Sequence, residues 1–250
     1  MVKYFHSTVY PSTATKVFVL LTALLCSAAR ATPTTPTESL LLPYKAQYRI
    51  SHDGLNTTAE RQLQRDGDHW KLSQTAKLFF LRVEEETVVE RHNGQLRPLR
   101  YRYENNLSSK QNQQVLFDWQ RGLVSDTKAS RPWQQVLKSD YSDQLSSQLQ
   151  LREMLMNNQL QGDISQTIVK KKGKLKTYQI QRLGNEHLDT AIGPLDTVKL
   201  RRHRQGSSSE SFIWVAPQLN YLIVKLEQHE DDELYTLDIL SANITTPGAE

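Results

Sequence analysis

Residues 44–51 read Tyr-Lys-Ala-Gln-Tyr-Arg-Ile-Ser, so apolar and polar side chains alternate strictly. Because successive side chains of a β-strand point to opposite faces, this alternation predicts a strand with one buried face and one solvated face. The pattern returns in residues 70–78, whose apolar members fall on one parity: Trp70, Leu72, Ala76 and Leu78. Strands of this kind are typical of antiparallel sheets.

Turn signals recur at short intervals: Asp53-Gly54, Asp66-Gly67-Asp68, Asn93-Gly94, Arg121-Gly122, Lys172-Gly173 and Gly193-Pro194. Asn-Gly between two strand-like segments is typical of a tight hairpin, because both residues tolerate a positive φ. The turns and the alternation together predict strands at 44–52, 57–66, 69–78, 83–92, 96–104, 112–119, 123–128, 166–172, 175–186, 194–204, 210–216, 221–229 and 233–241.

Residues 140–158 interrupt this rhythm. Their Leu and Met side chains lie three or four positions apart, which is the spacing of one helix face. We expect Ser139 or Asp140 to cap the start of this helix and Asn157-Asn158 to end it.

A long antiparallel meander has to curl or close, because exposed flat edges promote aggregation. The predicted fold is therefore mainly β: a strongly curved antiparallel sheet or open β-barrel, with one amphipathic helix packed on or in it. The concave apolar face of such a sheet is a natural ligand cavity. The residues expected to line it are Tyr101, Tyr103, Trp119, Trp214 and Leu149.

The N-terminal residues resemble an export signal. The chain of 250 residues carries 31 basic and 27 acidic side chains, and no acidic residue precedes Glu38. Residues 17–29 form an apolar run too short to span a bilayer, and Ala29-Arg30-Ala31 resembles a cleavage site. We predict a cleaved signal peptide at 1–31, a Thr/Pro-rich leader at 32–42, a single β-rich domain at 43–242 and a tail at 243–250.

Cleavage changes the charge of the chain. Removing residues 1–31 takes away three basic residues and the single Cys26, which leaves a nearly neutral, cysteine-free protein. Export without cysteine favours a bacterial periplasm over a disulfide-stapled eukaryotic secreted domain. Export also disfavours nucleic acid as a partner, although the formal charge of the whole chain is +4.

Candidate catalytic and metal-binding residues form no recognisable motif. The histidines after residue 31 lie apart from one another: His52, His69, His92, His187, His203 and His229. No metalloprotease motif, nucleophile elbow, P-loop or dinucleotide fingerprint occurs, so we expect no metal and no cofactor. Glu84-Glu85-Glu86 suggests paired catalytic carboxylates. The favoured interpretation instead places two of these carboxylates on the solvated face of a strand, with Glu85 near an edge.

One charge run stands out, made of Lys170, Lys171, Lys172, Lys174 and Lys176. Clustered lysines attract anionic lipid headgroups or lipopolysaccharide phosphate. The favoured interpretation is a solvated hairpin tip whose lysines guard a strand edge.

Several motifs in order resemble one bacterial family. They are Pro43-Tyr44-Lys45-Ala46-Gln47-Tyr48, Arg65-Asp66-Gly67-Asp68-His69-Trp70, Phe117-Asp118-Trp119, Gly193-Pro194-Leu195-Asp196-Thr197-Val198 and Phe212-Ile213-Trp214-Val215-Ala216-Pro217. Together they resemble the exported family called domain of unknown function 3108. The resemblance implies a periplasmic β-rich protein with no assigned activity. A more distant similarity is to periplasmic lipoprotein carriers, in which an unclosed barrel with a helical lid holds acyl chains.

These observations leave two main hypotheses about function. The first is a periplasmic, non-enzymatic binding or carrier protein for an apolar or lipid-like ligand, linked to the cell envelope. The second is an envelope assembly or interaction factor that acts through its surface on an envelope protein or membrane, with no small-molecule ligand. A hydrolase of envelope polymers is a third, although no motif supports it.

Overall fold

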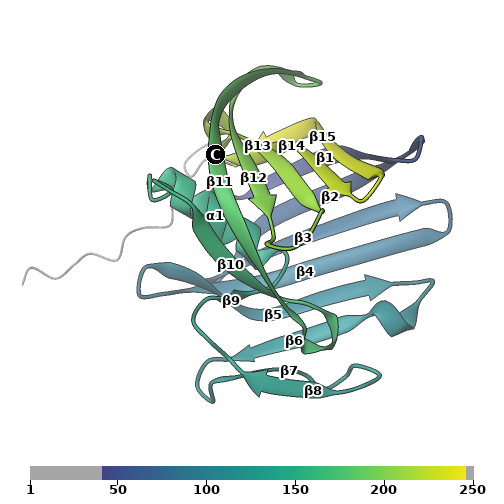
Figure 1. Ribbon diagram of the computed structural model, residues 1–250, viewed down its shortest axis with the longest axis vertical. Helices are drawn as coiled ribbons and strands as arrows, with labels where there is room; N and C mark the ends of the chain where they lie inside the picture. Colours follow the sequence, from purple (N-terminus) through teal and green to yellow (C-terminus); the bar gives the residue numbers. More distant parts are fainter. Residues whose placement is uncertain (1–40, 246–250) are drawn as a thin grey trace, which may run out of the picture. The chain divides into compact units, whose positions relative to one another are not determined.

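The computed structural model describes residues 41–245, which are built around one β-sheet (Figure 1). The predicted signal peptide at 1–31 and most of the predicted leader lie outside these residues. The sheet has 15 strands in the order β8-β7-β6-β5-β4-β3-β2-β1-β15-β14-β13-β12-β11-β10-β9.

The strands are β1 (Tyr44–His52), β2 (Leu55–Asp66), β3 (His69–Leu78), β4 (Leu81–His92), β5 (Gln95–Asn105), β6 (Gln113–Asp118), β7 (Leu123–Asp126), β8 (Trp133–Val136), β9 (Tyr141–Ser142), β10 (Ile164–Val169), β11 (Leu175–Thr190), β12 (Gly193–His203), β13 (Glu210–Ala216), β14 (Leu222–Glu230) and β15 (Glu233–Ile244). The helical elements are α1 (Ser146–Met156) and the short 3-10 turns η1 (Ser109–Gln111), η2 (Lys171–Gly173) and η3 (Pro217–Leu219).

Apart from β8 and β9, strands that follow one another along the chain lie side by side in the sheet, and β1 joins the two runs by pairing with β15. The predicted hairpin at Asn93-Gly94 is confirmed, because β4 ends at His92 and β5 begins at Gln95. Both turn residues have a positive φ, at 50° and 79°. The predicted fold class is confirmed: the protein is mainly β, with a strongly curved open sheet and one helix packed in it.

Two strands, β8 and β9, are absent from the prediction. They have four and two residues, which is too short for alternation to be recognised. The β9–β10 pair also runs in parallel, with Tyr141 opposite Thr167, so a wholly antiparallel sheet is wrong at this point. A parallel pair needs a crossover connection, and α1 supplies it.

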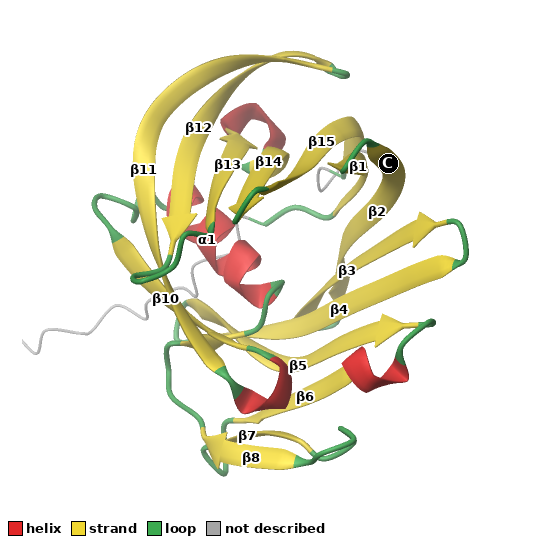
Figure 2. Cartoon of the chain, turned by 45° about the vertical axis from the view of Figure 1, so that its right-hand side comes forward, coloured by secondary structure: helices red, strands yellow, loops and turns green. Residues whose placement is uncertain are grey.

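Helix α1 lies within the curve of the sheet (Figure 2). Leu145, at its N-terminal end, and Leu149 pack in a core cluster that takes residues from β1 to β7 and also from β10 and β12 to β15. Leu151 and Leu155 belong to a second cluster, with residues from β11 to β14. The helix therefore fills the space between the two halves of the sheet, and it contributes apolar side chains to both.

The two edge strands, β8 and β9, lie at opposite ends of the strand order. The turn η2, which joins β10 to β11, contacts both β7 and β8. A Cβ atom on Gly173 of η2 would lie 2.8 Å from Cε3 of Trp133 in β8. The sheet is thus an open barrel that packing at η2 brings together without a hydrogen-bonded ladder.

Strand β15 extends to Ile244, so the predicted domain limit at 242 is too short. Ile244 lies opposite Tyr44, and the N–H of Thr245 donates to the carbonyl of Pro43 at 2.9 Å. Ile244 lies between polar residues, and the sequence pattern does not predict its pairing with Tyr44. Within residues 41–245, no helix has the length and apolar character needed to cross a bilayer.

We expect Gly173→Ala to lower the free energy of unfolding by about 1–2 kcal/mol, because the left-handed backbone conformation is unfavourable by roughly that amount for a residue with a Cβ. Gly173 has a φ of +70°, and its added Cβ would also press on Trp133. Urea unfolding followed by tryptophan fluorescence measures the change. The control is Gly206→Ala, where φ is likewise +70° and no atom lies within 4 Å of the added Cβ. Equal stability of the two variants would contradict the proposed packing at η2.

Candidate functional site

Each of three neighbouring strands has a polar side chain at a position where alternation predicts a buried apolar side chain. These residues are Arg61 in β2, Gln74 in β3 and Glu85 in β4, which we call the polar row. Arg61 lies directly opposite Gln74, and Gln74 lies directly opposite Glu85. The three side chains therefore form one line across the sheet.

Hydrogen bonds connect the polar row from end to end. Arg61 donates from Nε and Nη2 to Oε1 of Gln74, at 3.2 and 2.6 Å. The amide of Gln74 donates to Oε2 of Glu85, and the hydroxyl of Tyr101 donates to Oε1 of Glu85 at 2.6 Å. Each carboxylate oxygen of Glu85 thus has a donor, as a buried carboxylate requires.

A second buried carboxylate, Asp143, lies at the start of α1. Its Oδ2 accepts from the hydroxyl of Thr87 at 2.8 Å, and its Oδ1 accepts from the N–H groups of Leu145 and Ser146, both at 2.9 Å. Asp143 therefore ties the first turn of the helix to β4. The expected caps at residues 139 and 140 are wrong, because β9 occupies the chain before the helix begins. The predicted end is confirmed, with Asn157 as the C-terminal cap.

Side chains of α1 also bond to the strands of the first half of the sheet. Gln148 accepts from Nη1 of Arg61 at 2.9 Å, which links the helix to the polar row. Glu153 accepts from Arg91 of β4 in an ion pair. Hydrogen bonds of this charged kind are worth about 1.5–3 kcal/mol each, so the helix is held firmly on this side.

The second half of the sheet holds the same helix. The guanidinium of Arg152 donates to the carbonyl of Asn220 at 2.9 Å, just after η3. The amide of Gln166 in β10 donates to the carbonyl of Ser147 at 3.0 Å. Helix α1 is therefore bonded from both halves of the sheet.

Burial shifts the acid–base equilibria around this cluster. Loss of solvation raises the pKa of Glu85, and the nearby charge of Asp143 raises it further. Burial likewise raises the pKa of Asp143. Burial, followed by the charge of Arg202, lowers the pKa of Lys170 to about 8. Such shifts are typical of active sites, but they also occur in structural networks.

The arrangement has no access for a substrate. Glu85 is 7% exposed and bonded to Gln74 and Tyr101, whereas Asp143 is 0% exposed and bonded to Thr87 and the start of α1. The expectation that Glu85 lies near an edge is wrong, because β4 is an interior strand. Sequence analysis also missed Arg61 and Gln74. The available signal was a polar residue at the buried parity of each of three successive strands.

The five residues predicted to line a cavity all pack in one core cluster. Leu149, Trp214 and Tyr101 are 0%, 4% and 6% exposed. Trp214 donates from Nε1 to Glu186 at 2.7 Å. Tyr103 and Trp119 are half-buried against the same cluster, where Trp119 donates to the carbonyl of Pro98 at 2.7 Å. These aromatic residues therefore fill the core.

The lysine run lies at the turn between β10 and β11, as predicted, but its members separate. Lys172 and Lys174 are exposed, whereas Lys171 and Lys176 are half-buried. The ammonium group of Lys170 donates to Oε1 of Gln144, next to the start of α1. A wholly solvated run is therefore wrong for Lys170, which belongs to the buried polar cluster.

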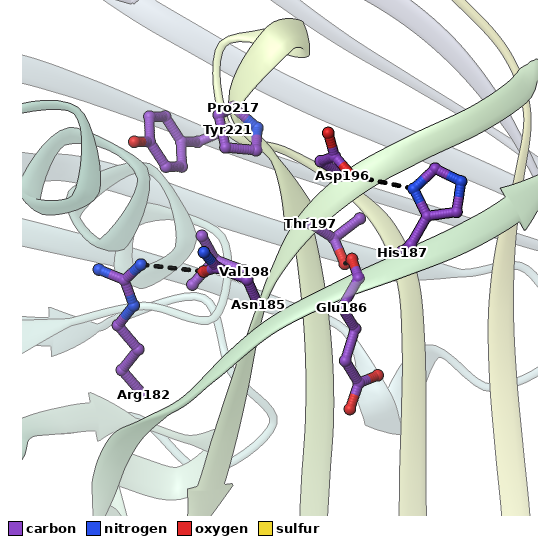
Figure 3. Close-up of a pocket in the computed structure, with 9 residues that line it drawn as sticks. All are labelled: Arg182, Asn185, Glu186, His187, Asp196, Thr197, Val198, Pro217 and Tyr221. Atoms are coloured by element: carbon purple, nitrogen blue, oxygen red, sulfur yellow. Dashed lines mark hydrogen bonds and ion pairs between the residues drawn. The ribbon is translucent and has the colours of Figure 1, made fainter.

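An open groove of about 440 Å³ lies along β11 and β12 (Figure 3). His187 Nδ1 lies 2.9 Å from Asp196 Oδ1, and Arg182 donates to Asn185 at 3.0 Å. A His–Asp pair is part of many nucleophilic sites. Here the buried hydroxyl of Thr197 is committed to a backbone carbonyl at 2.7 Å, and the His and Asp side chains are solvated. Within residues 41–245, no group of three or more His, Cys, Asp or Glu is arranged to hold a metal ion.

The sequence pattern of one protein family matches residues 44–239, and the family is described as a protein of unknown function (DUF3108). The chain belongs to this family. The match covers most of the described residues, so the resemblance seen in the sequence motifs is confirmed. None of the curated proteins matches the chain.

The fold of this DUF3108 protein is similar to that of a solved structure. A β-barrel-like protein of domain of unknown function DUF1849 from Brucella abortus superposes with a TM-score of 0.57 at 8% identity, covering 82% of this chain and 98% of that one. At this identity the likeness shows the fold alone.

Two further structures superpose more loosely. One is the Pseudomonas aeruginosa MucA/MucB complex, with a TM-score of 0.34, 11% identity and coverage of 85% of this chain and 55% of that one. The other is an exported protein candidate with a YmcC-like fold from Bacteroides fragilis, with a TM-score of 0.36, 9% identity and coverage of 81% and 96%.

We expect Glu85→Gln to change how stability depends on pH. A carboxyl pKa raised by folding stabilises the folded state at acidic pH, and this contribution is lost as pH rises from the ordinary value of 4.5 through the raised one. The amide mimics the protonated carboxyl, so the melting temperature of the variant relative to the wild type should increase with pH.

Thermal unfolding at a series of pH values above 4.5 measures this difference. The control is Glu60→Gln on the solvated side of β2, where Glu60 pairs with Lys45 at 3.2 Å. A Glu85→Gln curve parallel to that of the wild type would show that the buried carboxyl does not titrate as proposed.

We expect Asp143→Ala to destabilise the protein by about 2 kcal/mol. The change removes the acceptor of two N–H groups at the start of the helix, and it also removes the carboxylate to which the buried Thr87 hydroxyl donates. Asp143→Asn should cost less, because its carbonyl still accepts from the helix and its amide donates to the hydroxyl. Urea unfolding followed by circular dichroism ranks the two variants. A larger loss for the amide than for alanine would refute this role.

Proposed function

We propose that this DUF3108 protein is a non-enzymatic protein of the bacterial periplasm that acts as an envelope assembly or interaction factor through its outer surface. Export is supported by the signal-like pattern of residues 1–31. The family and the fold carry no assigned activity, so the argument rests on what the interior and the surface of the molecule offer.

The observation that carries the proposal is the position of α1. Its leucines are buried against both halves of the sheet, and the aromatic residues expected to line a cavity lie in the same core. An acyl chain in the concave face would need the volume that the helix fills. Displacing the helix would break its bonds to Arg61, Arg91 and Asn220 at a cost of several kcal/mol, on the order of 1.5–3 for each charged bond.

The groups that resemble catalytic sites favour a non-enzymatic role. The Glu85–Asp143 cluster is sealed and bonded to the helix. In the groove of Figure 3, the Thr197 hydroxyl is committed to the carbonyl of Glu186. A hydrolase needs an accessible nucleophile or activated water beside its base, and neither place provides one.

Native mass spectrometry of the protein recovered from the periplasm tests the proposal. We expect a single species that begins at Thr32 and carries no lipid, together with a protein partner captured by crosslinking in intact cells. A stoichiometric lipid in the native spectrum, lost on unfolding, would instead support the carrier hypothesis. Recovery of the protein in the cytoplasm with residues 1–31 intact would overturn the proposed location.

Photocrosslinking residues at two positions locate the contact. Val136 is 68% exposed on the edge strand β8, and Lys45 lies on the solvated side of the interior strand β1. A partner that adds a strand to the sheet edge would crosslink from position 136 and not from position 45. Equal capture from both positions would argue against a specific edge contact.

A further inference from the structure

Two turns at one end of the sheet present apolar side chains to solvent. Phe79 and Phe80 form the turn between β3 and β4 and are 86% and 87% exposed, and Leu107 before η1 is 65% exposed. Asn106 joins these turns, since its side chain donates to the carbonyl of Phe80 at 2.8 Å and accepts from the N–H of Arg82 at 2.7 Å. We call Phe79, Phe80 and Leu107 the apolar tip. Both turns lie at the right-hand end of the sheet in Figure 1.

The local backbone gives no reason for phenylalanine in this turn. Phe79 has a φ of 50°, a conformation that is unfavourable for a bulky residue and ordinary for Asn or Gly. The turn between β4 and β5 has the same length and uses Asn93-Gly94. A strained backbone bearing two solvated aromatic rings is destabilising for the free protein, and such strain persists mainly where function requires it.

A cluster of cations lies beside the apolar tip along the same end of the sheet. Lys110 of η1, Arg131 between β7 and β8, and Lys171 and Lys172 of η2 line one shallow cleft, which we call the cationic cleft. The cleft also contains Asp126, whose carboxylate accepts three backbone N–H groups and so holds the loop in place. Within residues 41–245, the four cations of the cleft form no ion pair.

The acidic residues near the apolar tip are neutralised or lie to one side. Glu84 pairs with Arg82, and Glu104 pairs with Arg102 at 3.1 Å. An acidic turn, residues 230–233, joins β14 to β15. This turn adjoins the β1–β2 hairpin, which carries the exposed Asp53 and lies between the acidic turn and the apolar tip in the strand order. The net charge at this end of the sheet is therefore positive around the apolar tip and the cationic cleft.

We propose that the apolar tip and the cationic cleft dock the protein on an anionic phospholipid bilayer. The inference deepens the proposed function by naming one surface partner, and it rests on that function because the bilayer meant is one that faces the periplasm. The phenyl rings would enter the interfacial region, where aromatic side chains are favoured, and the cations would lie at the level of the lipid phosphates.

The shape of this surface favours a bilayer over a protein partner. A stable protein interface needs about 800 Å² of complementary surface on each side. The apolar tip is a small projection on two turns, which a fluid bilayer accommodates without a matching cavity. The acidic turn at 230–233 would be repelled by anionic lipid, so the protein would dock tilted toward the cationic cleft.

Vesicle co-sedimentation tests the proposal, using the protein recovered from exporting cells with its N-terminus checked by mass spectrometry. The vesicles contain phosphatidylethanolamine and phosphatidylglycerol, with phosphatidylcholine in place of the latter as the neutral comparison. We expect Phe79→Asn with Phe80→Ser to weaken binding about tenfold or more, given the apolar area that each ring buries. The control is Leu183→Ser, an exposed leucine of β11 away from the apolar tip.

Charge is tested separately by replacing the four cations of the cleft with glutamine. We expect at least about a tenfold loss of binding, and weaker binding of the wild type in high salt. The control replaces four other cations with glutamine: Lys45, Arg100, Arg121 and Lys138. Circular dichroism confirms that each variant is folded. Equal losses in the two charge variants, or unchanged binding of the phenylalanine variant, would overturn the proposal, while the crosslinking result would stand by itself.

Discussion

The structure depends on how α1 is held between the two halves of an open sheet. The strand order leaves β8 and β9 without a common ladder, so hydrogen bonding alone does not fix the curvature. The helix supplies what is missing, since its leucines complete both core clusters and its polar side chains bond to strands of both halves. Both halves of the sheet present apolar and polar groups to the helix. The helix therefore makes apolar contacts and hydrogen bonds with each half.

The buried polar row explains why a structural element can resemble an active site. Glu85 and Asp143 have raised pKa values because the helix and sheet exclude water from them. Replacing such a network with apolar residues is often neutral for stability, whereas removing a single partner is costly. Its value here is positional, since the bonds from Thr87, Arg61 and Arg91 admit one placement of the helix.

Alternation, turn residues and helix spacing predicted most strands and α1 from the sequence, because each signal is local. The short strands β8 and β9 were missed, since two to four residues carry no periodicity. Of the predicted cavity residues, Tyr101 is buried beside the helix and Leu149 belongs to the helix itself. Trp214 shares a face of the sheet with Lys199 and Lys225, opposite to Leu200 and Ile213, which pack with the helix leucines. That outcome depends on where α1 packs, which no local pattern records. The burial of Lys170 could not be predicted for the same reason. Its ammonium group bonds to Gln144, which only the packing of α1 brings close.

The pairing of β1 with β15 has a consequence for how the chain reaches its native state. Tyr44 and Ile244 are partners, so the first strand of the sheet lacks one neighbour until the final strand has been made. Contacts so distant in sequence slow folding, and an unpaired strand is prone to aggregation while it waits. A polypeptide with this topology completes its sheet only after β15 has been made. Until then it would benefit from chaperones that shield its early strands.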